Sequence, residues 1–169
     1  MADSTLAAMT DIGTIAGTEL IYVDNGSADR KTTVNEILAY RKTQDLDNLE
    51  FVLDGGGSVL TAKIYGYIEV PYSCTIKRST LLADASGSVV VDLYKCTYAN
   101  FDGSATHPVG GDKITASAPP TLSSAVKAQD STLTGWTTTM TAGDILEFII
   151  TGSPATCKRV TISLQVQRT

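Results

Sequence analysis

Val160-Thr-Ile-Ser-Leu-Gln-Val-Gln167, near the end of the 169-residue chain, is the stretch that decides the fold. Apolar side chains occupy every second position from Val160 to Val166, and threonine, serine or glutamine fills the positions between them. Successive side chains of a β-strand point to opposite faces, so this pattern predicts a strand with one buried and one exposed face. Strict alternation of this kind is typical of antiparallel sheets.

The same alternation recurs upstream and predicts a sheet of short strands. Residues 63–70 and 89–93 alternate in this way, with Ile64, Ile68 and Val70 expected on the buried face of the first strand. Further strands are expected at 50–54, 75–84, 112–117, 122–130 and 144–151. Glycine- and proline-containing turns separate these segments. The sequence therefore predicts an all-β fold, a jelly-roll-like antiparallel sandwich of about eight strands.

The first part of the chain has a different character. Residues 1–18 show little periodicity and are expected to form an extended arm. Short strands at 19–24 and 30–33 flank an Asn-Gly pair, which favours a tight hairpin turn. A short helix is expected over residues 34–42.

The start of that helix carries a capping signal. Thr33 and Glu36 are spaced so that each side chain can bond the other's backbone N–H. A hairpin followed by two helical turns buries too little surface to be stable alone. We therefore expect two domains, an attachment module over 1–45 and the sandwich over 50–169.

The charge is unevenly distributed between the two parts. Residues 1–50 hold four bases and nine acids, 4 − 9 = −5, whereas the remainder holds nine of each. A nucleic-acid partner requires a basic surface, so none is expected. No apolar run is long enough for a membrane span, and Met1–Thr10 lacks the features of a signal peptide, so no membrane association is expected either.

Candidate catalytic residues are few. His107 is the only histidine and lies in a glycine-rich loop, so we expect an exposed loop side chain rather than a general base. Cys74, Cys96 and Cys157 are an odd set without metal-type spacing, and we expect buried thiols, in a protein made in a reducing cytosol. The sequence therefore predicts no catalytic residues and no enzyme.

Loop carboxylates are the candidate metal ligands. Asp102, Asp112 and Asp144 lie beside glycines, a setting in which calcium can bind. They lack the regular spacing of a calcium loop, and Asp144 is better placed for a turn hydrogen bond. We expect neither a metal nor a cofactor.

Aromatic residues offer two kinds of contact. Trp136, the only tryptophan, either closes one end of the sandwich or stacks on a sugar ring. Tyr65 and Tyr67 would share one strand face, where they could cover a surface between subunits.

One stretch combines an apolar strand, a glycine turn, a basic segment and a short helix: Gly17-Thr-Glu-Leu-Ile-Tyr-Val-Asp-Asn-Gly-Ser-Ala-Asp-Arg-Lys-Thr-Thr-Val-Asn-Glu-Ile37. In this it resembles an N-terminal module of tailed-bacteriophage virion structural proteins. Segments further along are similar to a β-sandwich domain of phage particles: 51–58, 81–92, 117–120, 133–136 and 141–146.

The resemblance implies a structural role in a virion, made in the host bacterial cytoplasm. We expect a capsid decoration (cement) protein, a homo-oligomer with a trimer favoured, whose arm binds the shell or other phage structural proteins. Candidate shell-binding residues are Leu20, Tyr22, Arg30, Lys31, Ile37 and Tyr40. The alternative is a small head or tail fibre protein whose sandwich binds host glycan through Trp136. A glycan-processing enzyme is disfavoured because no paired carboxylates stand out.

Overall fold

The computed structural model of this protein describes residues 20–24 and 29–169, and it divides into two compact units, one ending at Gln44 and the other spanning Asp45–Thr169. In the first unit, β1 (Leu20–Asp24) pairs antiparallel with β2 (Asp29–Thr33), and α1 (Val34–Gln44) follows. The predicted hairpin strands and short helix are therefore confirmed. The predicted arm and the Asn-Gly turn lie outside the described residues.

The predicted capping box at the start of α1 is also present. The backbone N–H of Glu36 donates to Thr33 Oγ1 at 3.1 Å, and the backbone N–H of Thr33 donates to Glu36 Oε2 at 2.7 Å. Each side chain thus satisfies a backbone donor that the first helical turn leaves without an intrahelical partner.

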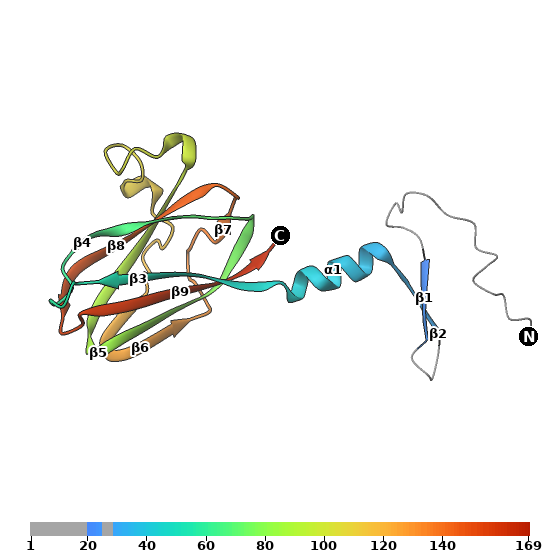
Figure 1. The fold of residues 1–169 in the computed structure, drawn as a ribbon, viewed down its shortest axis with the longest axis horizontal. Helices are drawn as coiled ribbons and strands as arrows, with labels where there is room; N and C mark the ends of the chain where they lie inside the picture. Colours follow the sequence, from blue (N-terminus) through green and yellow to red (C-terminus); the bar gives the residue numbers. More distant parts are fainter. Residues whose placement is uncertain (1–19, 25–28) are drawn as a thin grey trace, which may run out of the picture. The chain divides into compact units, whose positions relative to one another are not determined.

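The second unit is a curled antiparallel sheet, and the all-β sandwich is confirmed. Its sheet runs in the order β3-β9-β5-β8-β4, with β6 and β7 also paired to β5 (Figure 1). The strands are β3 (Leu46–Asp54), β4 (Lys63–Glu69), β5 (Cys74–Thr97), β6 (Thr121–Asp130), β7 (Thr139–Met140), β8 (Asp144–Ala155) and β9 (Arg159–Arg168). Two short 3₁₀ turns, η2 (Tyr98–Asn100) and η3 (Gly110–Asp112), lie between β5 and β6.

β5 belongs to both halves of the sandwich. Residues 74–83 pair with β9, and residues 88–97 pair with β8. The expectation of separate strands at 75–84 and 89–93 is therefore wrong, because the chain passes Gly87 without turning back. Gly87 is buried, and a Cβ atom there would lie 2.5 Å from Cys157 Sγ and would also collide with the carbonyl of Ala155.

The core lies between the two halves of the curled sheet. The alternate residues from Val160 to Val166 are fully buried, as the sequence pattern predicts. From the other half, Leu146, Phe148 and Ile150 of β8 join the same cluster. The rings of Phe51 and Phe148 stack at a centroid distance of 4.5 Å and so link β3 to β8.

β4 departs from the predicted alternation. Its pairing with β8 shifts between Ile64 and Gly66, so Tyr65 is an extra, bulged residue. Ile64 is 36% exposed, whereas Tyr65 packs against the core, so the expectation that Ile64 is buried is wrong. Gly66 has φ +156° and faces Phe51, whose Cζ would lie 2.8 Å from an added Cβ. A glycine is needed at this bulge for both reasons.

Residues 112–117 are not a strand, contrary to the expectation. They contribute one isolated bridge, from Lys113 to Tyr94, and the N–H of Ile114 donates to the carbonyl of Leu93. Ala116 adopts φ +48°, a left-handed conformation that ends any extended run. The apolar residues that suggested a strand instead bury an irregular crossing segment, with Ile114 in the core.

Substitution of Gly87 tests the passage of β5 between the two halves. Gly87→Ala is expected to lower the free energy of unfolding by about 2–4 kcal/mol, because the new methyl group collides with Cys157 and Ala155. Urea denaturation measures the loss. Gly111→Ala is the matched control, since no atom lies within 4 Å of its added Cβ. Equal stability of the two variants would contradict this account of β5.

Candidate functional site

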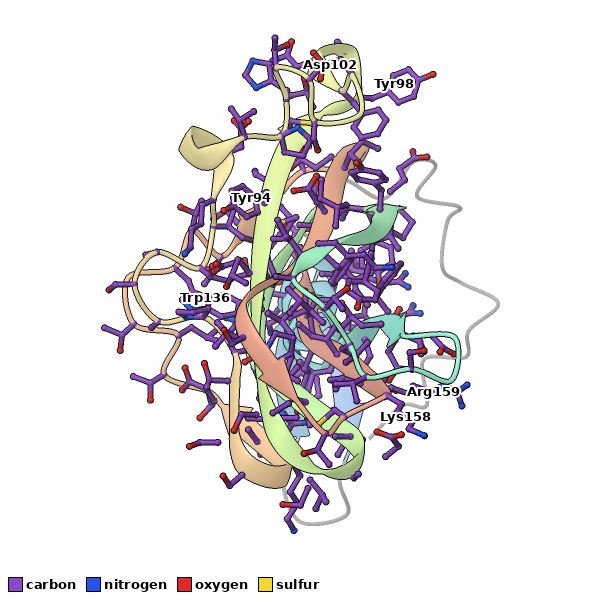
Figure 2. The ribbon with its side chains drawn as sticks, turned by 90° about the vertical axis from the view of Figure 1, so that its left-hand side faces the viewer. Tyr94, Tyr98, Asp102, Trp136, Lys158 and Arg159 are labelled. Carbon is purple, nitrogen blue, oxygen red and sulfur yellow. The ribbon has the colours of Figure 1, made fainter. Side chains whose placement is uncertain are left out.

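The outer face of β8 is covered at one end of the sandwich. Leu146 and Phe148 point into the core, so their neighbours Ile145 and Glu147 point away from it. Ile145 and Glu147 are nevertheless buried. Cys96 pairs with Ile145 and is buried as well. The cover is the segment that follows β5, residues 98–112, and Figure 2 shows its members Tyr98 and Asp102 at one end of the sandwich. We call residues 98–112 the cap loop.

Glu147 is the centre of the contacts beneath the cap loop. Only 2% of it is exposed, and it lies across from Tyr67 of β4 in the sheet register. The Ser104 hydroxyl donates to its carboxylate, and Tyr67 Oη lies 3.3 Å from Ser104 Oγ. The ring of Phe101 packs edge-on against Tyr67 with a centroid distance of 4.9 Å. One aromatic contact and two polar contacts therefore attach the cap loop to the sheet.

Burial raises the pKa of Glu147, because the carboxylate is removed from water. Hydrogen bonds from Ser104 and Tyr67 to the carboxylate oppose that rise, and the nearby negative charge of Asp112 adds to it. The surroundings of Glu147 thus raise its pKa overall.

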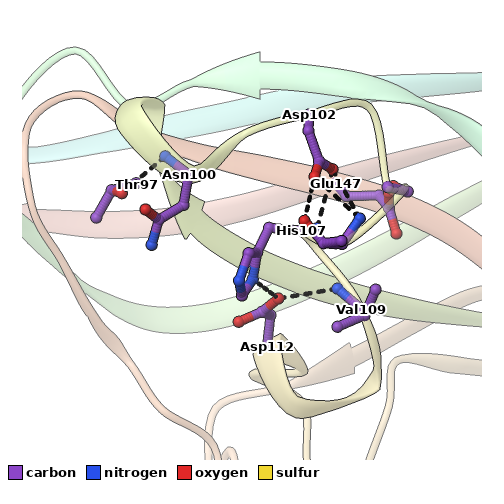
Figure 3. A network of polar contacts seen from close by, with 9 residues as sticks. Thr97, Asn100, Asp102, His107, Val109, Asp112 and Glu147 are labelled. Atoms are coloured by element: carbon purple, nitrogen blue, oxygen red, sulfur yellow. Dashed lines mark hydrogen bonds and ion pairs between the residues drawn. The ribbon is translucent and has the colours of Figure 1, made fainter.

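Two aspartates hold the cap loop in one conformation (Figure 3). Asp102 accepts hydrogen bonds from the backbone N–H of Thr106 and of His107, each at 2.9 Å, and from the Thr106 hydroxyl. These bonds lower the pKa of Asp102 to about 2. Asp112 Oδ2 lies 2.9 Å from His107 Nδ1 and accepts the N–H of Val109 at 2.9 Å. The cap loop is therefore fixed despite its glycines.

His107 does not form a nucleophile–base pair with any described residue. The His107 side chain is 41% exposed, and the hydrogen bond of its ring is to Asp112. Within the described ranges its ring bonds no serine, threonine or cysteine. Burial raises the pKa of the Cys74, Cys96 and Cys157 thiols, which disfavours their reactive thiolate forms.

The carboxylates considered as metal ligands have other partners. Asp144 pairs with Lys95 Nζ at 3.0 Å and accepts the N–H of Thr141 at 2.8 Å, which is the turn bond expected of it. Asp102 and Asp112 bond the cap loop. Among residues 20–24 and 29–169, no group of three or more histidine, cysteine, aspartate or glutamate side chains could hold a metal ion.

The Trp136 side chain makes contacts within the sandwich. Its ring packs against the core, and Nε1 donates to the carbonyl of Ala118 at 2.8 Å. This hydrogen bond therefore attaches the irregular segment before β6 to Trp136. Tyr65 and Tyr67 do not share a face: Tyr65 packs against the core, and its hydroxyl accepts the N–H of Thr61 at 2.9 Å, whereas Tyr67 lies beneath the cap loop. The bulge at Tyr65 separates them.

The candidate shell-binding residues belong to the first unit. Leu20 and Tyr22 lie in β1 and Arg30 and Lys31 in β2, with Tyr22 opposite Lys31, but their side chains are outside the description. Ile37 and Tyr40 lie on α1 and are 44% and 71% exposed. Leu38, beside them on α1, is 49% exposed.

Sequence reasoning missed the buried polar residues. Besides Glu147, the Asp92 carboxylate is buried and bonds Lys113 at 2.8 Å, Thr115 at 2.8 Å and Thr151 at 3.1 Å. One signal was available, because residues 145–150 are apolar at all positions except Glu147. A run without alternation indicates a strand buried on both faces.

Comparison with known proteins gives little. No family model matches the chain, and no curated protein matches it. One solved structure, RmlC from Streptococcus suis in complex with dTDP-D-xylose, aligns with 9% identity and a TM-score of 0.25. The alignment covers 89% of this chain and 62% of that one. A similarity this low supports no conclusion about fold or function. No helix among the described residues is long and apolar enough to cross a membrane.

The buried acid beneath the cap loop predicts a pH effect. Because the pKa of Glu147 is raised in the folded chain, the folded state retains a proton that the unfolded state has already released. The free energy of unfolding should therefore fall as pH rises from the ordinary glutamate pKa through the raised one. Glu147→Gln should remove this fall and make the chain more stable than the wild type at neutral pH.

Urea denaturation at a series of pH values measures the effect as the difference between variant and wild type. Aspartates such as Asp102, whose lowered pKa values act in the opposite direction, are present in both proteins and cancel. Glu69→Gln, at the exposed end of β4, is the control. A Glu147→Gln difference that does not change with pH would show that burial does not govern this group.

Proposed function

We propose that this chain is a structural component of a phage virion, a capsid decoration protein that binds the shell through its N-terminal unit and presents the sandwich outward. The observation that carries the proposal is a small separate unit whose helix leaves Ile37 and Leu38 largely exposed. The resemblance of residues 17–37 to phage attachment modules supplies the identity of the partner.

The first unit has the properties expected of a docking element. A two-stranded hairpin is marginally stable in water, and so is an isolated helix the length of α1. Exposed apolar side chains on such a unit gain free energy when a partner surface covers them. Burial of Ile37 and Leu38 on the shell would therefore stabilise both the unit and the attachment.

The sandwich fits the role of a presented body. Its core is extensive, and Asp92, Asp102, Asp112 and Asp144 each serve the fold as hydrogen-bonding or ion-pairing groups. A protein that binds the assembled shell but not its free subunits favours the assembled state by mass action. In this proposal the protein acts through added contacts, as a homo-oligomer for which a trimer is favoured, in virions made in the host bacterial cytoplasm.

The alternative is a head or tail fibre protein that binds host glycan through Trp136, whose ring is half-buried. Trp136 packs against the core and bonds Ala118, so it is a poor stacking platform for a sugar. We therefore prefer decoration of the shell.

The attachment can be tested with variants of the full chain. Ile37→Asp/Leu38→Asp is expected to remain folded in its sandwich and to be lost from particles, because charges replace the exposed apolar contacts. Leu82→Asp/Val126→Asp changes two comparably exposed apolar residues of the sandwich and is the matched control. Mass spectrometry of purified particles measures copies per virion.

Three outcomes decide the proposal. High copy number for the wild type and control, with loss of the α1 variant, supports it, as does earlier rupture on heating of particles that lack the protein. Presence at only a few copies, at one vertex or on the tail, would overturn the decoration role. Full incorporation of the α1 variant would overturn the assignment of attachment to Ile37 and Leu38.

A further inference from the structure

We infer that a small pocket between β5 and β6 is a binding site for one sugar ring. The pocket has a volume of about 100 Å³ and is lined by Ser79 and Leu81 of β5, residues 118–121, and residues 128–130 of β6. This inference does not depend on the proposed function, since it concerns the sandwich alone.

The pocket exists because small side chains face inward at this edge of the sheet. Ser79 pairs with Asp130 in the register, and Leu81 pairs with Ala128, so these four residues lie side by side on the two strands. Leu81 is fully buried and Ser79 nearly so. Serine and alanine leave unfilled the space that larger residues would occupy beside Leu81. The segment that contains Pro119 and Pro120 forms the opposite wall.

The walls of the pocket are fixed before any ligand arrives. Trp136 Nε1 donates a hydrogen bond to the carbonyl of Ala118, and the N–H of Val91 donates to the carbonyl of Pro120 at 2.9 Å. The Asp130 carboxylate accepts the N–H of Thr132 at 2.8 Å and that of Leu133 at 3.2 Å. A preformed pocket loses little conformational entropy on binding.

The chemistry of the lining selects the ligand class. Leu81, Ala128 and the two proline rings offer apolar contacts, and prolines have no backbone N–H to donate. Asp130 keeps lone pairs beyond the two that bond the backbone, and the Thr121 hydroxyl already donates to the carbonyl of Pro119. The Ser79 hydroxyl can donate or accept, and the Gln129 side-chain amide does both, so the lining offers donors as well as acceptors. A ring with an apolar C–H face and several hydroxyl groups satisfies both parts of this lining.

The size of the pocket limits the ligand further. A volume near 100 Å³ is well below the roughly 300–1,000 Å³ of sites that enclose a whole small molecule, so the pocket takes part of a single ring and leaves the rest in solvent. We therefore expect recognition of one terminal or branching sugar unit of a glycan. This site differs from the Trp136 surface, because Trp136 here supports the wall through Ala118.

Nuclear magnetic resonance of the ¹⁵N-labelled full chain tests the site. The probes are methyl α-D-glucopyranoside, methyl β-D-galactopyranoside and N-acetyl-D-glucosamine, each titrated into the millimolar range expected for a single ring. At least one should shift the amide signals of residues 79–81, 118–121 and 128–130 in a saturable manner. Ethanolamine, a small cation, is titrated separately to test whether Asp130 simply attracts positive charge.

Variants separate a real pocket from surface contact. Ala128→Leu places a larger side chain in the pocket and should abolish the shifts. Lys127→Leu introduces leucine at the adjacent, exposed position of β6, so the shifts should remain. Ser79→Ala removes one hydroxyl without filling space and should weaken binding about tenfold, the effect of one ordinary hydrogen bond.

The possible outcomes are distinct. Saturable shifts for a sugar that Ala128→Leu abolishes and Ser79→Ala weakens support the site. Absence of shifts with all three sugars overturns it, and so do shifts with ethanolamine alone. Sugar shifts that are unchanged in a folded Ala128→Leu variant would also overturn it.

Discussion

One continuous strand connects the two halves of the sandwich, and its passage depends on a contact that only glycine permits. Where β5 leaves β9 and joins β8, Gly87 packs directly against Cys157 and the carbonyl of Ala155. Any side chain at that point would separate β5 from the end of β8 and the start of β9. Through this passage a single strand contributes core residues to both halves.

Buried polar groups then attach the irregular segments to that frame. Asp92 bonds the crossing segment through Lys113 and Thr115, and Glu147 bonds the cap loop through Ser104. An ionised group that is buried is costly unless it is paired and hydrogen-bonded, so these contacts restrict where each segment can lie. The two sites differ in charge, because Asp92 has a cationic partner and Glu147 has hydroxyl partners.

The sequence alone was sufficient wherever the determining interactions are local. The alternation from Val160 to Val166 and the capping pair of Thr33 and Glu36 are local patterns, and both predictions are confirmed. The passage of β5 through Gly87 has no local signal, because the residue that Gly87 contacts, Cys157, lies far along the chain. The placement of Glu147 under the cap loop depends equally on a distant segment. The pocket beside Ser79 depends on a strand register that no local pattern specifies.

The bulge at Tyr65 has a consequence for how copies of this chain behave when crowded together. β4 is an edge of the seven-stranded sheet, and an edge strand offers backbone groups to which another chain can add a strand. The register shift between Ile64 and Gly66 interrupts the regular spacing of those groups, so an incoming strand loses alignment partway along. The bulge therefore makes β4 a poor template for addition of a strand from another chain.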